Sequence, residues 1–157
     1  MNGRLLPAVS TCSVRSMPPA ANSPFARRLP SVCRRSPFWL VAFIVWAVVL
    51  WFLSDGPMPG PKGAGMPGMD KVLHFGYYFG GAGLLSAAIY LPQRDHPNWG
   101  ALIVLVVLVV SAVGLIDEWH QSWHPERSGN DAGDWLADAY GALAGAIVFK
   151  RVHRVLG

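Results

Sequence analysis

Four stretches of this sequence are apolar over enough residues to cross a lipid bilayer as a helix. They are residues 37–54, 71–91, 99–116 and 131–149. About 20 helical residues span the roughly 30 Å hydrocarbon core of a membrane. The first and third stretches contain no Asp, Glu, Lys or Arg. We therefore predict an all-α, polytopic membrane protein folded as a four-transmembrane-helix bundle, in which the two more polar stretches are shielded by the other two.

The composition agrees with a membrane protein rather than a soluble domain. Of the 157 residues, 52% are hydrophobic and 14% are charged, whereas a soluble domain has about 25% charged residues. The formal net charge is +4, but the basic residues are divided among separate segments. The expected partner is therefore the lipid bilayer and not nucleic acid, and a homo-oligomer stays open. Cys12 and Cys33 precede the first apolar stretch and have no metal-binding spacing.

The segments outside the apolar stretches divide the chain further. Residues 1–36 are rich in Arg, Ser and Pro and contain no acid, so we predict a disordered basic cytoplasmic tail. An organellar transit peptide is the alternative, and the start stays open between Met1 and Met17. The predicted order is then a signal-anchor helix at 37–54, a Gly/Pro/Met-rich outer loop at 55–70, a domain of three transmembrane helices at 71–149, and a basic cytoplasmic tail at 150–157.

The Lys and Arg residues predict the orientation, because cytoplasmic loops carry more of them than outer loops. With the N-terminus inside, ten lie on the cytoplasmic side: Arg4, Arg15, Arg27, Arg28, Arg34, Arg35, Arg94, Lys150, Arg151 and Arg154. Only Lys62, Lys71 and Arg127 lie outside. This bias predicts a multi-pass protein of the bacterial cytoplasmic (inner) membrane with both termini cytoplasmic. Every acid except Asp95 then falls on the outer side.

Helical spacing indicates which polar residues share a face at the outer helix ends. Asp131, Asp134 and Asp138 stand at i, i+3 and i+7 on the fourth stretch. Asp70 and His74 stand at i and i+4 on the second. If the third helix continues past Ile116, one more polar face contains Asp117, His120, Gln121 and His124. We therefore expect three polar faces to meet. An ionisable residue within a span needs a partner or a function.

Paired glycines predict which helices touch. Gly76 and Gly80 on the second stretch, and Gly141 and Gly145 on the fourth, each form a small-xxx-small motif. Such motifs let the backbones of membrane helices approach closely. We therefore predict that the second and fourth helices pack against each other.

Each polar candidate also has a purely structural interpretation. His74 would then hydrogen-bond a neighbouring helix, and Arg127 would form a structural ion pair. His120 and His124 would be ordinary interfacial residues. Asp131 precedes a helix and would serve as its N-cap.

These motifs resemble the VanZ-like family, named for a glycopeptide-resistance accessory protein. The stretches that carry the resemblance are DKVLHFGYYFG and LIDEWHQSWHPERSGNDAGDWLADAYGALAG. The family pattern falls on Asp70, Lys71, His74, Asp117, Glu118, Gln121, Pro125, Arg127, Asp134 and Asp138, with Gly141 and Gly145 behind. The similarity covers residues 71–149. Two positions differ from the family pattern. The family often has Gly at the position of Glu126 and Asn at the position of Asp138.

The resemblance implies an outer-face site that acts on or binds an envelope component or amphiphile, with a link to teicoplanin-type glycopeptide resistance. Whether the protein is an enzyme stays open. An enzyme would use Asp134 or Asp138 as general base with His74 as acid/base partner. The candidate substrate-binding residues are Asp70, Lys71, Asp117, Glu118, Gln121 and Arg127. Lys71 and Arg127 would hold an anionic headgroup, for example of a lipid-linked envelope precursor or an amphiphilic antibiotic.

Two other functions use the same residues. A non-enzymatic binding or envelope-integrity protein would hold the ligand without reaction. A small cation- or proton-coupled carrier is disfavoured, because the acids stop in the outer half of the spans. Carboxylate oxygens suit divalent cations. The residues that could bind such a cation are Asp117, Glu118, Asp131 and His120. No His-Glu-x-x-His motif occurs, so the metal and the cofactors are left unknown.

Overall fold

The structure, a computed structural model, describes residues 30–55, 68–123 and 131–156. In these ranges it contains four long helices: α1 Ser36–Ser54, α2 Met69–Tyr90, α3 Trp99–Gln121 and α4 Ala132–Val152. Short 3-10 helices occur at Ser31–Arg34, Leu91–Gln93 and His153–Val155. The described ranges contain no strand, so the prediction of an all-α fold is confirmed.

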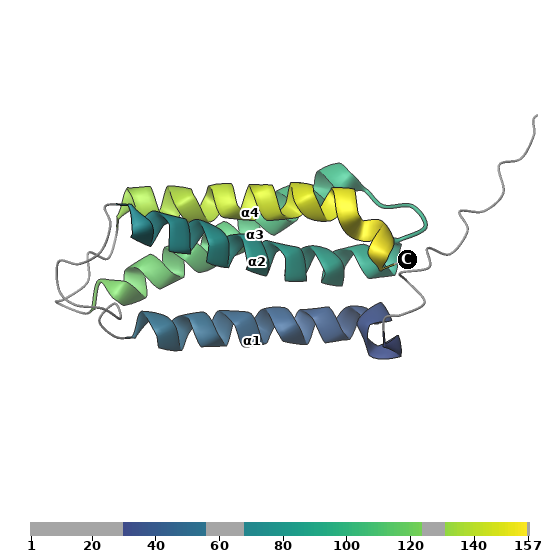
Figure 1. Ribbon diagram of the computed structural model, residues 1–157, viewed down its shortest axis with the longest axis horizontal. Helices are drawn as coiled ribbons and strands as arrows, with labels where there is room; N and C mark the ends of the chain where they lie inside the picture. The colour runs from purple at the N-terminus through teal and green to yellow at the C-terminus, as the bar shows by residue number, and fades with distance from the viewer. Residues whose placement is uncertain (1–29, 56–67, 124–130, 157) are drawn as a thin grey trace, which may run out of the picture.

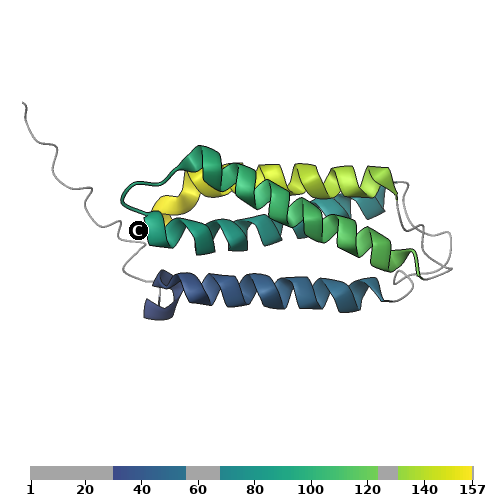
Figure 2. The ribbon, with the colours of Figure 1, turned by 180° about the vertical axis from the view of Figure 1, so that it is seen from behind.

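The four helices run along a common direction and alternate in sense (Figure 1). The start of α1, the turn between α2 and α3 and the end of α4 lie at one end of the bundle, and both views agree on this (Figure 2). The opposite end holds the end of α1, the start of α2, the end of α3 and the start of α4. We call it the acidic end; its acids are Asp55, Asp70, Asp117, Glu118, Asp131 and Asp134.

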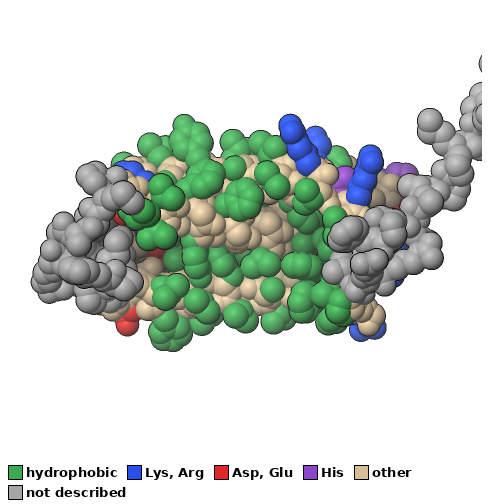
Figure 3. All heavy atoms as spheres, in the orientation of Figure 1, with side chains coloured by type: hydrophobic (Ala, Val, Ile, Leu, Met, Phe, Trp, Pro, Cys, Tyr) green, Lys and Arg blue, Asp and Glu red, His purple; other side chains and the backbone are tan. Residues whose placement is uncertain are grey.

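Three of the helical segments are long and apolar enough to cross a membrane. They are Ser36–Ser54, Met69–Gln93 and Trp99–Gln121. On the face shown in Figure 3, hydrophobic side chains are spread along the middle of the bundle, and most of the visible Lys and Arg side chains gather toward the end where α4 finishes. On α1, for example, Val41 is 58% and Phe52 71% exposed. A soluble monomer rarely exposes such a continuous apolar surface, so the chain is a helical membrane protein. Helix α4 is not among the three segments.

Two glycines of α4 pack directly against the backbone of α2. A Cβ at Gly141 would collide with the backbone carbonyl oxygen of Phe75, and one at Gly145 with that of Phe79. The prediction that the second and fourth helices pack together is therefore confirmed, and this pair has the most extensive contact. The paired glycines of α2 do not contribute, because a Cβ at Gly76 or Gly80 would meet nothing within 4 Å.

Helix α1 is attached to α2 through an aromatic contact. Trp46 Nε1 donates a hydrogen bond to the backbone oxygen of Tyr77 at 3.2 Å, and the Tyr77 hydroxyl donates one to the backbone oxygen of Trp46 at 3.0 Å. The two rings stack with centroids 5.2 Å apart. Gly81 leaves room for the indole, since a Cβ there would lie 2.5 Å from a ring atom. The pair fixes α1 against the bundle near its middle.

The predicted boundaries differ from the observed ones at several ends. Helix α3 continues past Ile116 to Gln121, as the predicted polar face on that helix requires. Residues 31–34, the last part of the tail predicted to be disordered, form a 3-10 helix. Residues 69 and 70 of the predicted outer loop belong to α2. The tail before residue 30 and loop residues 56–67 lie outside the described residues.

Candidate functional site

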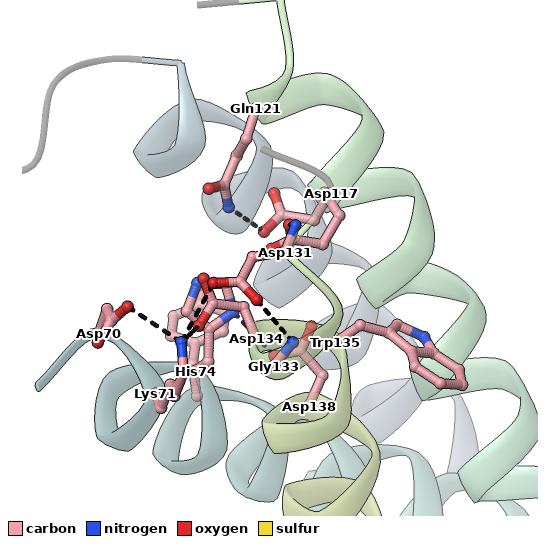
Figure 4. Close-up of polar contacts among 12 residues, drawn as sticks. Asp70, Lys71, His74, Asp117, Gln121, Asp131, Gly133, Asp134, Trp135 and Asp138 are labelled. Atoms are coloured by element: carbon pink, nitrogen blue, oxygen red, sulfur yellow. Dashed lines mark hydrogen bonds and ion pairs between the residues drawn. The ribbon is translucent and has the colours of Figure 1, made fainter. Parts of the chain in front are cut away.

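Lys71 lies in the first turn of α2, where three carboxylates share its ammonium nitrogen (Figure 4). Nζ is 2.8 Å from Asp134 Oδ1, 3.2 Å from Asp131 Oδ2 and 3.4 Å from Asp70 Oδ2. The Asp134 side chain is only 6% exposed, so it is the carboxylate that most needs a counter-ion. Lys71 therefore links α2 to α4 and offsets the charge of Asp134. The role predicted for Lys71 from the sequence, to hold an anionic headgroup, stays a prediction.

Asp131 caps the start of α4. Its Oδ1 accepts a hydrogen bond from the backbone nitrogen of Gly133 at 2.7 Å, and its own backbone nitrogen donates to Glu118 Oε2 at 2.9 Å. The bond from Gly133 and the nearby Lys71 ammonium lower the pKa of Asp131 below its ordinary value of 3.8. The N-cap interpretation of Asp131 is confirmed. The contact with Glu118 ties the start of α4 to the end of α3.

His74 and Asp138 form a buried pair between α2 and α4. His74 Nδ1 lies 2.9 Å from Asp138 Oδ1, and the two side chains are 10% and 0% exposed. Gly114 of α3 makes room for the carboxylate, because a Cβ there would lie 2.7 Å from Asp138 Oδ2. The ring of Tyr78 lies nearly parallel to the imidazole, with centroids 6.3 Å apart. Two of the three predicted catalytic residues are therefore direct partners of each other.

A pocket of about 480 Å³ opens between α1, α2 and α3. Its polar groups include Asp117 and Gln121, which are themselves joined by a 2.8 Å hydrogen bond from Gln121 Nε2 to Asp117 Oδ2. His74 contributes from α2. The apolar walls come from Leu50, Leu53, Val72, Leu73 and Tyr77. Apolar walls with a few convergent polar groups are the usual form of a small-molecule site.

Three side chains from three helices could hold a metal ion. They are His74 of α2, Glu118 of α3 and Asp134 of α4, and one ligand atom of each lies within 4.8 Å of the others. Of the metal set predicted from sequence, only Glu118 belongs to this group in the described chain. Asp131 caps α4 instead, and the ring of His120 stacks on Trp51 with centroids 3.7 Å apart.

The structure gathers most of the predicted site residues at the acidic end. They form three contacting groups: Asp70, Lys71, Asp131 and Asp134; His74 and Asp138; and Asp117 and Gln121, with Glu118 beside Asp131. The remaining predicted residues, His124, Pro125, Glu126 and Arg127, lie outside the described residues.

Two residues that the sequence did not single out help to shape the site. Tyr78 is fully buried, and its hydroxyl has no hydrogen-bond partner among the described residues. It follows His74 by one helical turn, and this i, i+4 spacing could have indicated it. Gly114 admits Asp138 into the bundle. No spacing marks Gly114, because its role depends on a contact between helices.

The comparisons with known proteins give one partial similarity. No known family model matches the chain, and no solved structure does. Among curated proteins, the chain is similar to the phosphatidylglycerol–prolipoprotein diacylglyceryl transferase of Symbiobacterium thermophilum, with 35% identity over 77 residues. The similar region is 43% of this chain. The chain spans only 27% of the length of that relative.

Proposed function

We propose that this chain is a VanZ-like membrane protein of four transmembrane helices that binds an amphiphilic envelope component at its acidic end. The pocket between α1, α2 and α3 carries the proposal. An acyl chain would lie against Leu50, Leu53 and Val72, and the headgroup would meet Asp117 and Gln121. A pocket with one apolar and one polar part suits an amphiphile better than a fully polar solute.

Helix α4 is the proposed fourth span, although it is less apolar than the others. Its 21 residues match the roughly 20 that cross a bilayer. Its two internal acids, Asp134 and Asp138, face the bundle and are 4% and 0% exposed. The residues that it exposes include Leu136, Ile147 and Val148. The lipid-facing side of α4 would then be mainly apolar, with the 63% exposed Tyr140 contributing its hydroxyl, and the cost of the two acids in hydrocarbon is avoided.

The proposed orientation places the acidic end at the outer face of a bacterial inner membrane. The basic residues of the described chain support it, because the end opposite the acidic end holds Arg34, Arg35, Arg94, Lys150, Arg151 and Arg154. Cytoplasmic segments carry such an excess. Reporter fusions after residues 60 and 157 test this. An alkaline phosphatase fusion at 60 should be active and one at 157 inactive, and the reverse pattern would place the site in the cytoplasm.

The charge of the pocket lining indicates which class of amphiphile it would bind. The described pocket lining contains Asp117 and no Lys or Arg, so it favours a headgroup that donates hydrogen bonds, such as a polyol or an amine. The similar transferase carries phosphatidylglycerol and a prolipoprotein in its name, which supports an envelope lipid or a lipid-linked precursor as the ligand class. The VanZ-like resemblance adds an amphiphilic glycopeptide antibiotic of the teicoplanin type to that class.

Acid–base chemistry on the bound amphiphile is the second candidate function. The His74–Asp138 pair favours it, because a carboxylate on Nδ1 fixes the tautomer and orientation of an imidazole that lines the pocket. Asp134 lies nearby on α4 as the other candidate base. If chemistry occurs, His74→Gln, whose side-chain amide can still donate a hydrogen bond to Asp138, should stop turnover of the amphiphile and leave its binding in place.

Co-purification with native lipid tests the binding proposal. The full chain is purified in mild detergent, and the retained molecules are identified by mass spectrometry against the bulk membrane lipids. One amphiphile class should be enriched severalfold, and Asp117→Leu should reduce that enrichment. Asp95→Asn, an exposed acid at the opposite end, is the matched control and should retain it. A retained fraction identical to bulk lipid in all three proteins would contradict the proposal.

A further inference from the structure

His74, Glu118 and Asp134 converge from three different helices at the acidic end. One nitrogen or oxygen atom of each lies within 4.8 Å of the other two. The side chains of His74 and Asp134 are 10% and 6% exposed, and Glu118 is 3% exposed. An imidazole and two carboxylates are therefore held close together, mostly out of contact with solvent.

One oxygen of the buried Glu118 carboxylate has no hydrogen-bond or ion-pair partner among the described residues. Its Oε2 accepts a hydrogen bond from the backbone of Asp131, whereas Oε1 is buried and has no partner among the described residues. A buried carboxylate is costly unless it is paired or coordinates a metal. The nearby Lys71 ammonium is bound by Asp134, Asp131 and Asp70. Asp138 Oδ2, also buried and without a described partner, adds to the negative charge.

His74 has the kind of hydrogen-bond partner that metal-binding histidines usually have. Its Nδ1 faces Asp138 Oδ1 at 2.9 Å, so a proton on Nδ1 leaves the lone pair on Nε2. Metal-binding histidines almost always donate their second ring nitrogen to a carboxylate or carbonyl, which raises their basicity. Asp138 is therefore the positioning residue for His74, and Gly114 is the glycine that lets it approach.

We infer that His74, Glu118 and Asp134 bind a divalent transition-metal ion such as Zn²⁺ or Mn²⁺. The imidazole favours a transition metal over Mg²⁺ or Ca²⁺, which prefer oxygen ligands alone. For Zn²⁺, bonds of about 2.1 Å in a tetrahedral arrangement would bring the ligand atoms to about 3.4 Å from one another. From the observed separations of 4.8 Å or less, the ligand atoms would have to approach one another by up to about 1.4 Å on binding. Three protein ligands leave a fourth position for water or a ligand group.

This inference goes beyond the proposed function and does not rest on it. The metal site is formed by α2, α3 and α4, whereas the pocket lies between α1, α2 and α3. His74 belongs to both. A chain that binds metal without an amphiphile, or an amphiphile without metal, would separate the two claims.

Metal titration of the purified full-length protein tests the site. The protein in detergent is stripped with chelator and titrated with Zn²⁺ and, separately, Mn²⁺, by calorimetry and by thermal melting. We expect a single tight site and a Tm that rises with the ion. Glu118→Gln keeps the shape and the acceptor for Asp131 and should weaken binding at least tenfold. Asp138→Asn should weaken it about 10–100-fold, and Asp95→Asn should leave it unchanged.

X-ray absorption of the Zn²⁺-loaded wild-type protein tests the ligand set without any variant. The inference predicts one imidazole nitrogen among oxygen ligands. Two or more imidazoles, or Zn²⁺ affinity that is equal in wild type, Glu118→Gln and Asp95→Asn, would mean adventitious binding elsewhere and overturn the inference. Failure of both ions to bind the wild type would overturn it as well.

Discussion

His74 Nδ1 and Asp138 Oδ1 lie 2.9 Å apart inside the bundle and join α2 to α4. Asp138 is fully buried on a helix that is less apolar than its neighbours. The pair therefore allows α4 to carry an acid inside the bundle, because each polar group meets the other instead of apolar side chains. The same pair fixes the imidazole beside the pocket and beside the candidate metal ligands.

Removal of one member of the pair should destabilise the bundle strongly. His74→Ala leaves the Asp138 carboxylate buried without its partner, which typically costs about 3–5 kcal/mol. Thermal melting in detergent measures the loss. The double variant His74→Ala/Asp138→Ala should be less destabilised than the sum of the two single variants. Strict additivity of the three values would contradict a direct pair.

Substitution of a glycine should be harmful on α4 and harmless on α2. Gly141→Ala pushes a methyl group into the backbone of Phe75, and overpacking of this kind costs about 1–3 kcal/mol. Gly80→Ala is the matched control, because its Cβ meets nothing within 4 Å. It should be neutral or gain about 0.5–1 kcal/mol from helix propensity. Equal Tm values for the two variants would show that α2 and α4 do not touch at Gly141.

The Asp131 carboxylate should make stability depend on pH in the acid range. Its pKa in the folded protein lies below the ordinary value of 3.8. Its contribution is therefore fully present above that value and is lost as the pH falls through the lower, folded-state pKa. Asp131→Asn keeps an N-cap side chain but removes the charge beside Lys71. The variant should melt below wild type at neutral pH.

The Tm difference between wild type and Asp131→Asn measures how the stabilisation by the Asp131 charge depends on pH. The difference should shrink as both proteins are titrated through the folded-state pKa of Asp131, which lies below 3.8, since wild-type Asp131 becomes uncharged there. A difference that stays constant across the titration would assign the effect to the cap geometry rather than to charge.

The sequence predicted the helices well because their signal is local. Residues 37–54 and 99–116 are free of charge over the length of a membrane span, and their helices α1 and α3 begin within a residue of those starts. The i, i+4 spacing of Asp117 and Gln121 also correctly placed these two side chains on one face. Both inferences depend only on positions along one helix.

The pairings between helices could not be predicted in the same way. Spacing shows that Lys71 and Asp134 lie at helix ends, but not that the ammonium would be bound by carboxylates from another helix. The glycine motifs of α2 and α4 look equivalent in sequence, yet only Gly141 and Gly145 face a neighbouring backbone. Helix rotation decides both outcomes, and rotation is set by packing of the whole bundle.

Occupation of the pocket by an amphiphile is tested most directly by a side chain that fills it. Gly76 lines the pocket, whereas Gly80, one turn further along α2, does not, and a Cβ at either position meets nothing within 4 Å. Native mass spectrometry of Gly76→Leu and Gly80→Leu compares the amphiphile retained by each. The account predicts that Gly76→Leu loses most of it and that Gly80→Leu retains the wild-type amount. Equal retention by both variants would contradict binding in this pocket.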